Sequence, residues 1–278
     1  MDTFNFSKWN KILGWVVFVI ALTVYTLTVE PTASFWDAGE YIATSSKLQV
    51  GHPPGAPLFQ MIGAAASIFS SDPSQIAFVV NMTSAFASAL AILFMFWSIT
   101  ILVKKLILQD EKLTKSKGIA ILGSGLVGSL AFTFTDSFWF NAVEAEVYAM
   151  ATCILAVLFY LGLLWERDMH KPRGNKWLVL IAFIVGLSFG VHFMGLLSIP
   201  AIGLLYYFKN YKEITIKNFI IANVTVVAIL LFIFKLLLPS TLKLFGWFEV
   251  MFVNTFGLPF NSGTIFLGLV IIALFYFL

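Results

Sequence analysis

Long apolar stretches alternate with short polar connections along this chain. A helix needs about 20 apolar residues to cross a bilayer, and the stretches of roughly that length are 12–29, 76–103, 118–135, 149–165 and 219–238. The run 177–208 is too long for one crossing and has basic flanks, so we expect two short helices that turn near Gly190. The pattern predicts an all-α fold, a polytopic transmembrane helical bundle with about seven spans.

Two further apolar pieces complete this pattern. The piece 58–70 is short, and if it crossed the membrane the lysines after residue 103 would lie on the wrong side, so we expect an interfacial helix in the first outer loop. Asp72 and Pro73 should open the next span as N-cap and first helical residue. The run from Thr264 is unbroken at Leu278, which predicts a truncated eighth span and a protein that continues.

Composition places the chain among integral membrane proteins. Hydrophobic residues make up 60% of it and charged residues 11%, against roughly half and about a quarter in an average soluble domain, and the mean hydropathy is +0.93. The net charge is +3, and the basic residues that give it lie in the connections between the predicted spans, as in membrane proteins. We therefore expect no nucleic-acid partner. The single cysteine, Cys153, excludes a disulfide within the chain. We expect one transmembrane domain, 1–278.

Charge predicts how the bundle is oriented. The positive-inside rule assigns to the cytoplasm the alternate connections that carry Lys8, Lys11, Lys104, Lys105, Lys112, Lys115, Lys117, Arg167, Lys171, Arg173, Lys176, Lys209, Lys212 and Lys217. The opposite connections collect Glu30, Asp37, Glu40, Asp72, Asp136, Glu144, Glu146 and Glu249. The N-terminus is therefore expected in the cytoplasm and the acidic loops on the outer face.

The first outer loop carries the strongest candidate for chemistry. Asp37 and Glu40 are three residues apart, so on a helix they share a face about one turn apart, as a general base and a supporting carboxylate would. Carboxylates are costly beside lipid unless they line a watery pocket or bind something. A structural alternative stays open, because Ser34 and Asp37 also have the spacing of a capping box.

Two histidines accompany these acids. His52 stands in the turn His52-Pro53-Pro54-Gly55, where both prolines fix the backbone. It could orient a substrate hydroxyl or phosphate, or bond a neighbouring carbonyl. His192, in the predicted outer turn near Gly190, could join the same site or serve as a hydrogen-bonded turn residue.

A second acidic loop lies between two predicted spans. Glu144 and Glu146 would point to opposite sides of a helix, so we expect one of them to face a pocket. Glu144 is favoured because Tyr148 lies one turn further along the same face. A solvated acidic loop is the alternative.

The segment after the span 219–238 is expected to form a third, ordered outer loop. It contains Glu249 and the stretch 252–263, in which Asn254 is a candidate substrate contact. Cys and His residues do not occur at metal-ligand spacing, and no Gly-rich phosphate loop is present. A carboxylate-bound divalent ion stays open.

Four strings of residues resemble one family. These strings are 35–41 (FWDAGEY), 51–55 (GHPPG), 138–148 (FWFNAVEAEVY) and 253–260 (VNTFGLPF). They resemble a bacterial family of membrane proteins of unknown function that is related to the animal endoplasmic-reticulum O-mannosyltransferase acting on IPT domains. The order of span, acidic loop, His-Pro-Pro turn, interfacial helix and second acidic loop resembles the amino-terminal module of GT-C glycosyltransferases.

This resemblance implies transfer of a sugar, expected to be mannose, from a polyprenyl-phosphate carrier to a protein hydroxyl on the outer face of a bacterial inner membrane. By motif, Asp37 would be the catalytic base, with Glu40, His52 and Glu144 in the pocket. O-mannosyltransferases carry two adjacent acids in the first loop, whereas Ala38-Gly39 separates them here. The division of roles between the two acids therefore stays open.

The leaving lipid phosphate would need cationic or metal stabilisation. The outer side offers few cations, so Lys235 and Lys243 are the candidates, with snorkelling to the interface as the alternative for Lys235. Two other classes of protein stay open. A secondary transporter would place its acids near mid-span, and a non-catalytic assembly subunit would need no paired carboxylates.

Overall fold

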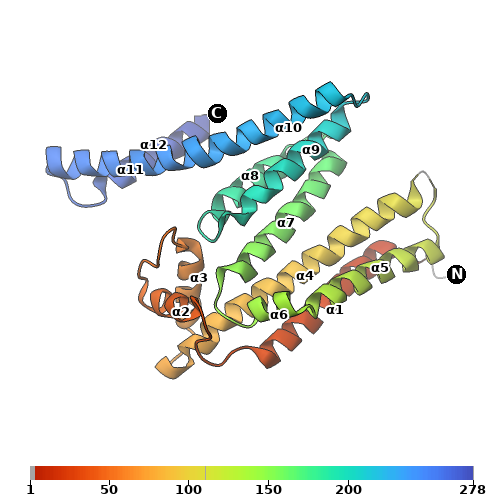
Figure 1. Ribbon diagram of the computed structural model, residues 1–278, viewed down its shortest axis with the longest axis horizontal. Helices are drawn as coiled ribbons and strands as arrows, with labels where there is room; N and C mark the ends of the chain where they lie inside the picture. Colours follow the sequence, from red (N-terminus) through yellow and green to blue (C-terminus); the bar gives the residue numbers. More distant parts are fainter. Residues whose placement is uncertain (1–3, 110, 278) are drawn as a thin grey trace. The chain divides into compact units, whose positions relative to one another are not determined.

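The computed structural model describes residues 4–109 and 111–277 (Figure 1). Within these residues the regular structure is helical and no strand occurs, which confirms the predicted all-α class. The chain packs as two compact units, Met1–Lys209 and Asn210–Leu278. The single domain expected for 1–278 stays a prediction.

Four long helices form the frame of the first unit. They are α1 (Phe6–Thr28), α4 (Ile76–Leu108), α5 (Lys115–Thr133) and α7 (Val147–Asp168), and each covers a predicted span. α4 packs against the other three (Figure 1). Its buried side chains are mostly small, and small side chains let neighbouring helices approach closely; they include Ser84, Ala85, Ala87, Ser88, Ala89 and Ala91. α4 is therefore the central helix of this unit.

Short helices occupy the connections at one end of this frame. α2 (Ala38–Lys47) and α3 (Pro57–Ser67) follow α1, and α6 (Asp136–Ala142) precedes α7. α3 is too short to cross a bilayer, which confirms that 58–70 does not form a span; its place at the interface stays a prediction. The Asp72 carboxylate accepts the N–H of Ser74 at 2.9 Å and begins the 3₁₀ turn η1 (Pro73–Gln75) that leads into α4.

The run 177–208 divides as expected. α8 (Lys176–Ser188) ends in a turn, followed by the 3₁₀ helix η2 (Phe193–Leu197) and α9 (Ser198–Asn210). The turn packs against α3, because the Gly190 carbonyl accepts the N–H of Leu58 at 2.7 Å. A Cβ on Gly190 would lie 2.7 Å from the Leu58 Cβ, so the contact requires glycine.

The second unit corrects one expectation. The span was expected to end at residue 238, with Glu249 and the stretch 252–263 in an outer loop. Instead the helix continues through α10 (Ile216–Leu231), η3 (Phe232–Leu237), α11 (Leu238–Val250) and η4 (Met251–Thr255). Pro239 normally breaks a helix because it lacks an N–H; here the wider π-helical turn η3 comes directly before it. The Glu249 carboxylate then accepts the N–H of Thr264 at 2.9 Å and holds the start of α12 (Ser262–Phe277).

This is a multi-pass membrane protein. Five helical stretches in the described residues are long and apolar enough to cross a bilayer, and the last of them is Ile216–Thr255. Large apolar side chains such as Val127 and Val224 are exposed on them, as expected of surfaces that face lipid. The predicted number of about seven spans stays a prediction.

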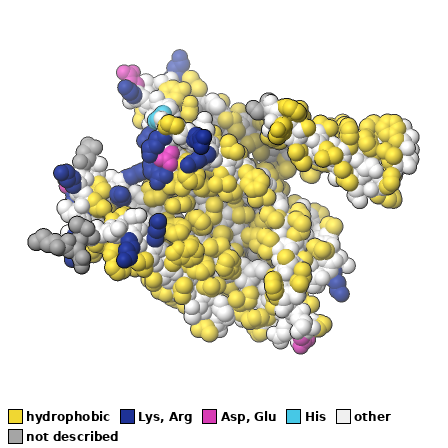
Figure 2. Space-filling model, turned by 180° about the vertical axis from the view of Figure 1, so that it is seen from behind, with side chains coloured by type: hydrophobic (Ala, Val, Ile, Leu, Met, Phe, Trp, Pro, Cys, Tyr) yellow, Lys and Arg dark blue, Asp and Glu magenta, His cyan; other side chains and the backbone are white. Residues whose placement is uncertain are grey.

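The basic residues of the first unit gather at one end of the bundle. Lys105 at the end of α4 and Lys209 at the end of α9 both pair with Glu166 near the end of α7. Figure 2 shows most of the Lys and Arg side chains on one side of the view, beside a largely hydrophobic surface. The grouping agrees with the charge pattern from which the orientation was predicted.

Cysteine labelling tests this orientation. In a Cys153→Ser background, Phe35→Cys should react with a membrane-impermeant maleimide on intact cells, because Phe35 is 85% exposed at the acidic end. Lys112→Cys should react only after the cells are opened. Labelling of position 112 and protection of position 35 in intact cells would reverse the orientation.

Candidate functional site

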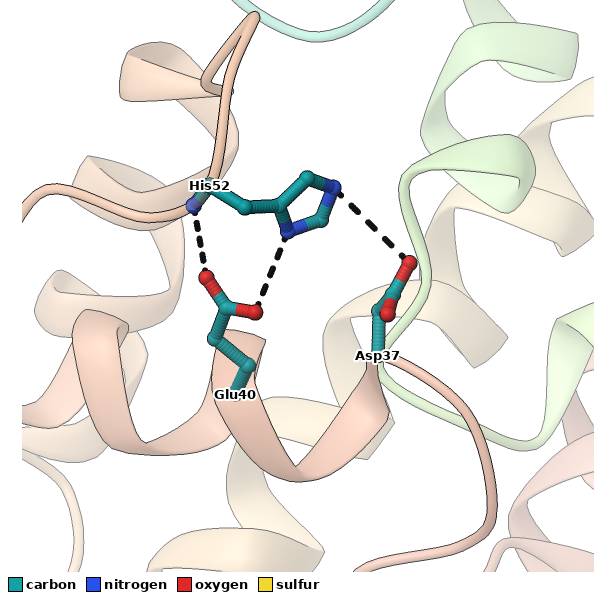
Figure 3. Close-up of side chains that lie close together, drawn as sticks. All are labelled: Asp37, Glu40 and His52. Atoms are coloured by element: carbon teal, nitrogen blue, oxygen red, sulfur yellow. Dashed lines mark hydrogen bonds and ion pairs between the residues drawn. The ribbon is translucent and has the colours of Figure 1, made fainter.

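Asp37, Glu40 and His52 come together beside the start of α2 (Figure 3). Glu40 receives two hydrogen-bonding contacts from His52: the main-chain N–H lies 2.6 Å from Oε1, and ring Nδ1 lies 3.1 Å from Oε2. His52 Nε2, on the other side of the ring, lies 3.8 Å from Asp37 Oδ2. The imidazole is therefore held between two carboxylates, one tightly and one loosely.

Local backbone structure explains this arrangement. α2 begins directly after Asp37, so Glu40 falls in its first turn and both side chains lie at the same end of the helix. After α2 the chain returns through the turn at His52, whose carbonyl accepts the N–H of Gly55 at 2.8 Å. Gly55 has φ of 79°, a value that strongly favours glycine. The Tyr41 ring, which belongs to α2, packs against the His52 ring with 5.9 Å between the ring centroids.

The structure does not form the alternative capping box at Asp37. Asp37 is the N-cap of α2, yet its side chain makes no capping hydrogen bond. Ser34, the expected partner, instead donates its hydroxyl to Glu144 Oε2 at 2.5 Å. The Asp37 side chain is 55% exposed, so solvent or a substrate can reach its carboxylate.

Hydrogen bonds from His52 determine the protonation state of Glu40. The main-chain N–H of His52, and after it the His52 ring, lower the pKa of the Glu40 carboxyl below its usual value. Glu40 is therefore ionised near neutral pH and accepts from Nδ1–H. A neutral imidazole with a proton on Nδ1 has its lone pair on Nε2, on the side of Asp37.

Glu144 and Glu146 are both buried. The shared helical face that was expected for Glu144 and Tyr148 does not form. α7 begins only at Val147, so Glu144 and Tyr148 do not share a helical face. Burial raises the pKa of Glu144 against the opposing effect of its hydrogen bond from Ser34. Burial, reinforced by the charges of Glu144 and Asp37, raises the pKa of Glu146 to about 7.

Glu146 is thus a neighbour of Asp37 that sequence reasoning set aside. Its negative charge also contributes, after burial and ahead of Asp37, to raising the pKa of Tyr41 to about 12. The sequence feature that could have indicated Glu146 is its position directly before an apolar run. That is an N-cap position, which Glu146 occupies for α7.

His192 and Tyr148 contact each other. Their ring centroids lie 5.3 Å apart, and His192 Nδ1 accepts the N–H of Met194 at 3.2 Å as the cap of η2. Burial lowers the pKa of His192, so the ring is neutral near pH 7. These contacts fit the turn-forming alternative for His192, while its role and that of Tyr148 at a substrate stay predictions.

Lys235, Lys243 and Asn254 belong to the second compact unit, on η3, α11 and η4 respectively. Lys235 Nζ lies 5.4 Å from the centre of the Phe234 ring. The roles expected for these three residues at a substrate stay predictions.

A divalent ion has one candidate position in the described part of the chain. Asp37, Glu40 and His52 each offer one ligand atom, and these atoms lie within 4.8 Å of one another. Because both oxygens of Glu40 accept from His52, an ion bound there would replace part of that bonding. The residues that hold the imidazole are therefore the same ones that could hold a metal.

Comparisons with known proteins identify relatives. The family model described as "Protein O-mannosyl-transferase TMEM260 N-terminal domain" matches residues 37–215, so the match begins at Asp37. "Protein O-mannosyl-transferase tmem260" of Dictyostelium discoideum is 27% identical over 153 residues, 55% of this chain and 17% of that protein. The mouse protein named "Protein O-mannosyl-transferase TMEM260" is 27% identical over 172 residues, 62% of this chain and 22% of that protein. The chain thus aligns with 17% to 22% of the length of these relatives, and no solved structure matches it.

Glu146→Gln tests the environment of the buried carboxyl. Because folding raises the pKa of Glu146 from 4.5 to about 7, its contribution to stability is fully present below pH 4.5 and is lost as the pH rises through about 7. The parent should therefore lose stability relative to Glu146→Gln between pH 5 and pH 8, by up to roughly 3 kcal/mol.

Thermal unfolding of the detergent-solubilised protein at both pH values measures this change. Glu213→Gln is the matched control, because it makes the same substitution at an exposed glutamate. Equal pH dependence in the two variants would contradict the assignment.

Proposed function

Because the chain belongs to the family of the protein O-mannosyl-transferase TMEM260 N-terminal domain, we propose that it is the membrane module of a protein O-mannosyltransferase of the GT-C type. The relatives that carry this activity in their names support a sugar donor and a protein acceptor. The observation that carries the proposal is the reachable Asp37 carboxylate beside the imidazole that Glu40 holds.

Asp37 acts as the general base in this proposal. An acceptor hydroxyl is a weak nucleophile near neutral pH, and a carboxylate within hydrogen-bond reach can take its proton. As the hydroxyl oxygen forms its bond to the anomeric carbon, the bond from that carbon to the phosphate oxygen breaks. The electron pair leaves with the polyprenyl phosphate, and the proton goes to an Asp37 oxygen.

His52 and Glu40 position this base. The Glu40 carboxylate fixes the ring through Nδ1 and directs Nε2 toward Asp37, as the third member of a catalytic triad orients a histidine. Nε2 can then receive the proton from Asp37 and prepare the carboxylate for the next acceptor. Glu40 and His52 are positioning residues in this scheme, since Asp37 is the group that touches the substrate.

The proposed donor is a polyprenyl-phosphate sugar, and the proposed site of reaction is the outer face of a bacterial inner membrane. The separation of acidic and basic ends in the first unit supports this orientation. The three site residues lie in connections and in the first turn of a short helix, away from the middle of the long spans. A transporter would require them near mid-span, so their position favours the transferase.

Asp37→Asn tests the base directly. Asparagine is as good an N-cap as aspartate, so the variant should melt like the parent and still bind the donor. Sugar transfer should fall by about 10²- to 10⁴-fold, because the amide cannot accept the proton. Mass spectrometry of an acceptor protein incubated with a polyprenyl-phosphate mannose measures the loss.

Asp136→Asn is the matched control, because it makes the same change at an exposed acid, the first residue of α6. It should keep the parent rate. If Asp37→Asn retained more than about a tenth of that rate, another carboxylate, with Glu40 first, would be the base.

The role proposed for Lys235 and Lys243 is to hold the phosphate of the donor. Replacing the responsible lysine by glutamine should weaken donor binding about tenfold or more, since it removes a charge-assisted contact to phosphate. Lys217→Gln, a change in a predicted cytoplasmic connection, should leave donor binding unchanged. Donor affinity that stays at the parent value in both variants would remove these lysines from the site.

A further inference from the structure

A separate cavity lies at the basic end of the first unit. It has a volume of about 560 Å³ and is lined by the N-terminal part of α1 and the C-terminal parts of α4 and α7. α1 has 23 residues, so its two ends are about 34 Å apart at 1.5 Å per residue. Asp37 follows the far end of α1, and the cavity is therefore about the thickness of a bilayer core away from it.

Three cations from three different helices line this cavity: Lys11 of α1, Lys104 of α4 and Arg167 of α7. No carboxylate lines it among the described residues. Lys104 Nζ lies 5.2 Å from the centre of the Phe6 ring. Arg167 uses Nε and Nη2 to bond Asp168 at 2.9 and 2.6 Å, and a guanidinium has five N–H donors in all. The cavity wall is therefore net positive and rich in donors.

Several other cations at the same end are paired with carboxylates. Glu166 pairs with Lys105 and Lys209, and Asp168 pairs with Lys171 as well as with Arg167 of the cavity. Within the described ranges, Lys11 and Lys104 form no such pair. Lys11 and Lys104 thus bring two charges from two helices to one cavity without a carboxylate partner in the described ranges.

The remaining lining is mostly aromatic and apolar. The Trp15 and Trp97 rings meet edge to face at 6.3 Å, and the Trp97 and Tyr160 rings lie 5.8 Å apart. Tryptophan and tyrosine prefer the level of the lipid head groups. Asn10 adds a polar group to this wall, and its Oδ1 is buried without a hydrogen-bond partner among the described residues. Such an acceptor is costly unless a donor satisfies it, and a head-group hydroxyl can donate where a phosphate oxygen cannot.

We propose that this cavity binds the phosphate group of an anionic membrane phospholipid. Lys and Arg donate to phosphate oxygens through charge-assisted hydrogen bonds, and basic pockets between transmembrane helices suit anionic head groups. Inorganic phosphate offers the same oxygens, but the aromatic wall provides a surface that only the glycerol backbone and first methylenes of a lipid would cover. The cavity lies at the ends of three helices that are long and apolar enough to span a membrane, the level at which lipid head groups lie.

Native mass spectrometry of the detergent-solubilised protein tests this inference. Phosphatidylglycerol should bind more tightly than phosphatidylcholine with the same acyl chains. In Lys11→Gln/Lys104→Gln the Kd for phosphatidylglycerol should rise about tenfold or more, because two contacts to the phosphate are lost. The control, Lys112→Gln/Lys115→Gln, removes the same charge from exposed positions that do not line the cavity and should stay within about twofold of the parent.

Three outcomes would overturn the proposal. Equal losses in the two double variants would show diffuse attraction by the basic end, and equal affinity for both lipids would show that the phosphate-binding cations do not select the head group. Displacement of the lipid by millimolar inorganic phosphate would identify a soluble anion as the ligand.

If the double variant is not monodisperse, Lys104→Gln alone carries the same test with a smaller expected loss. The measurement requires no transferase activity, so it is independent of the function proposed above.

Discussion

The side-chain amide of Asn81 connects the loops that carry the acidic residues. Asn81 is fully buried on α4, and its Nδ2 donates to the carbonyls of Glu30 at 2.6 Å and Thr32 at 3.0 Å. The N–H of Glu30 in turn donates to the carbonyl of Val143 at 2.9 Å. The segment that leaves α1 is thereby fixed between α4 and the α6–α7 connection. The approach of Asp37 to the second acidic loop depends on these bonds, because it follows Thr32 by only a few residues.

The membrane explains why chemistry concentrates at the two ends of this bundle. A charged side chain is expensive in the hydrocarbon core, so the long helices carry small and apolar residues through their middle parts and charged residues near their ends. The small buried side chains of α4 bring α1, α5 and α7 close to it. The same packing therefore assembles acids from separate connections at one end and cations from separate helices at the other.

The sequence predicted the features that depend on length, charge and short-range spacing. Span lengths, the turn between α8 and α9, the cap at Asp72 and the shared end of Asp37 and Glu40 follow from such local rules. The N-cap position of Glu146 could be read from the sequence, but its burial and its approach to Asp37 could not, because they depend on which loop packs against it. The helical continuation through Pro239 was missed because proline predicts a break and a π-helical turn has no clear sequence signal.

The neighbouring carboxyls near α2 and α7 are in different environments, and this difference supports the division of roles. If all of these carboxyls were ionised, their negative charges would repel one another, and this repulsion would favour the protonated form of each. Bonding from His52 keeps Glu40 ionised, whereas burial raises the pKa of Glu144 and brings that of Glu146 to about 7. Neighbouring carboxyls whose pKa values are pushed apart can take different roles. Glu40 thus keeps the charge that holds the His52 ring, whereas the raised pKa values of the buried glutamates reduce the negative charge that the second acidic loop brings to the site.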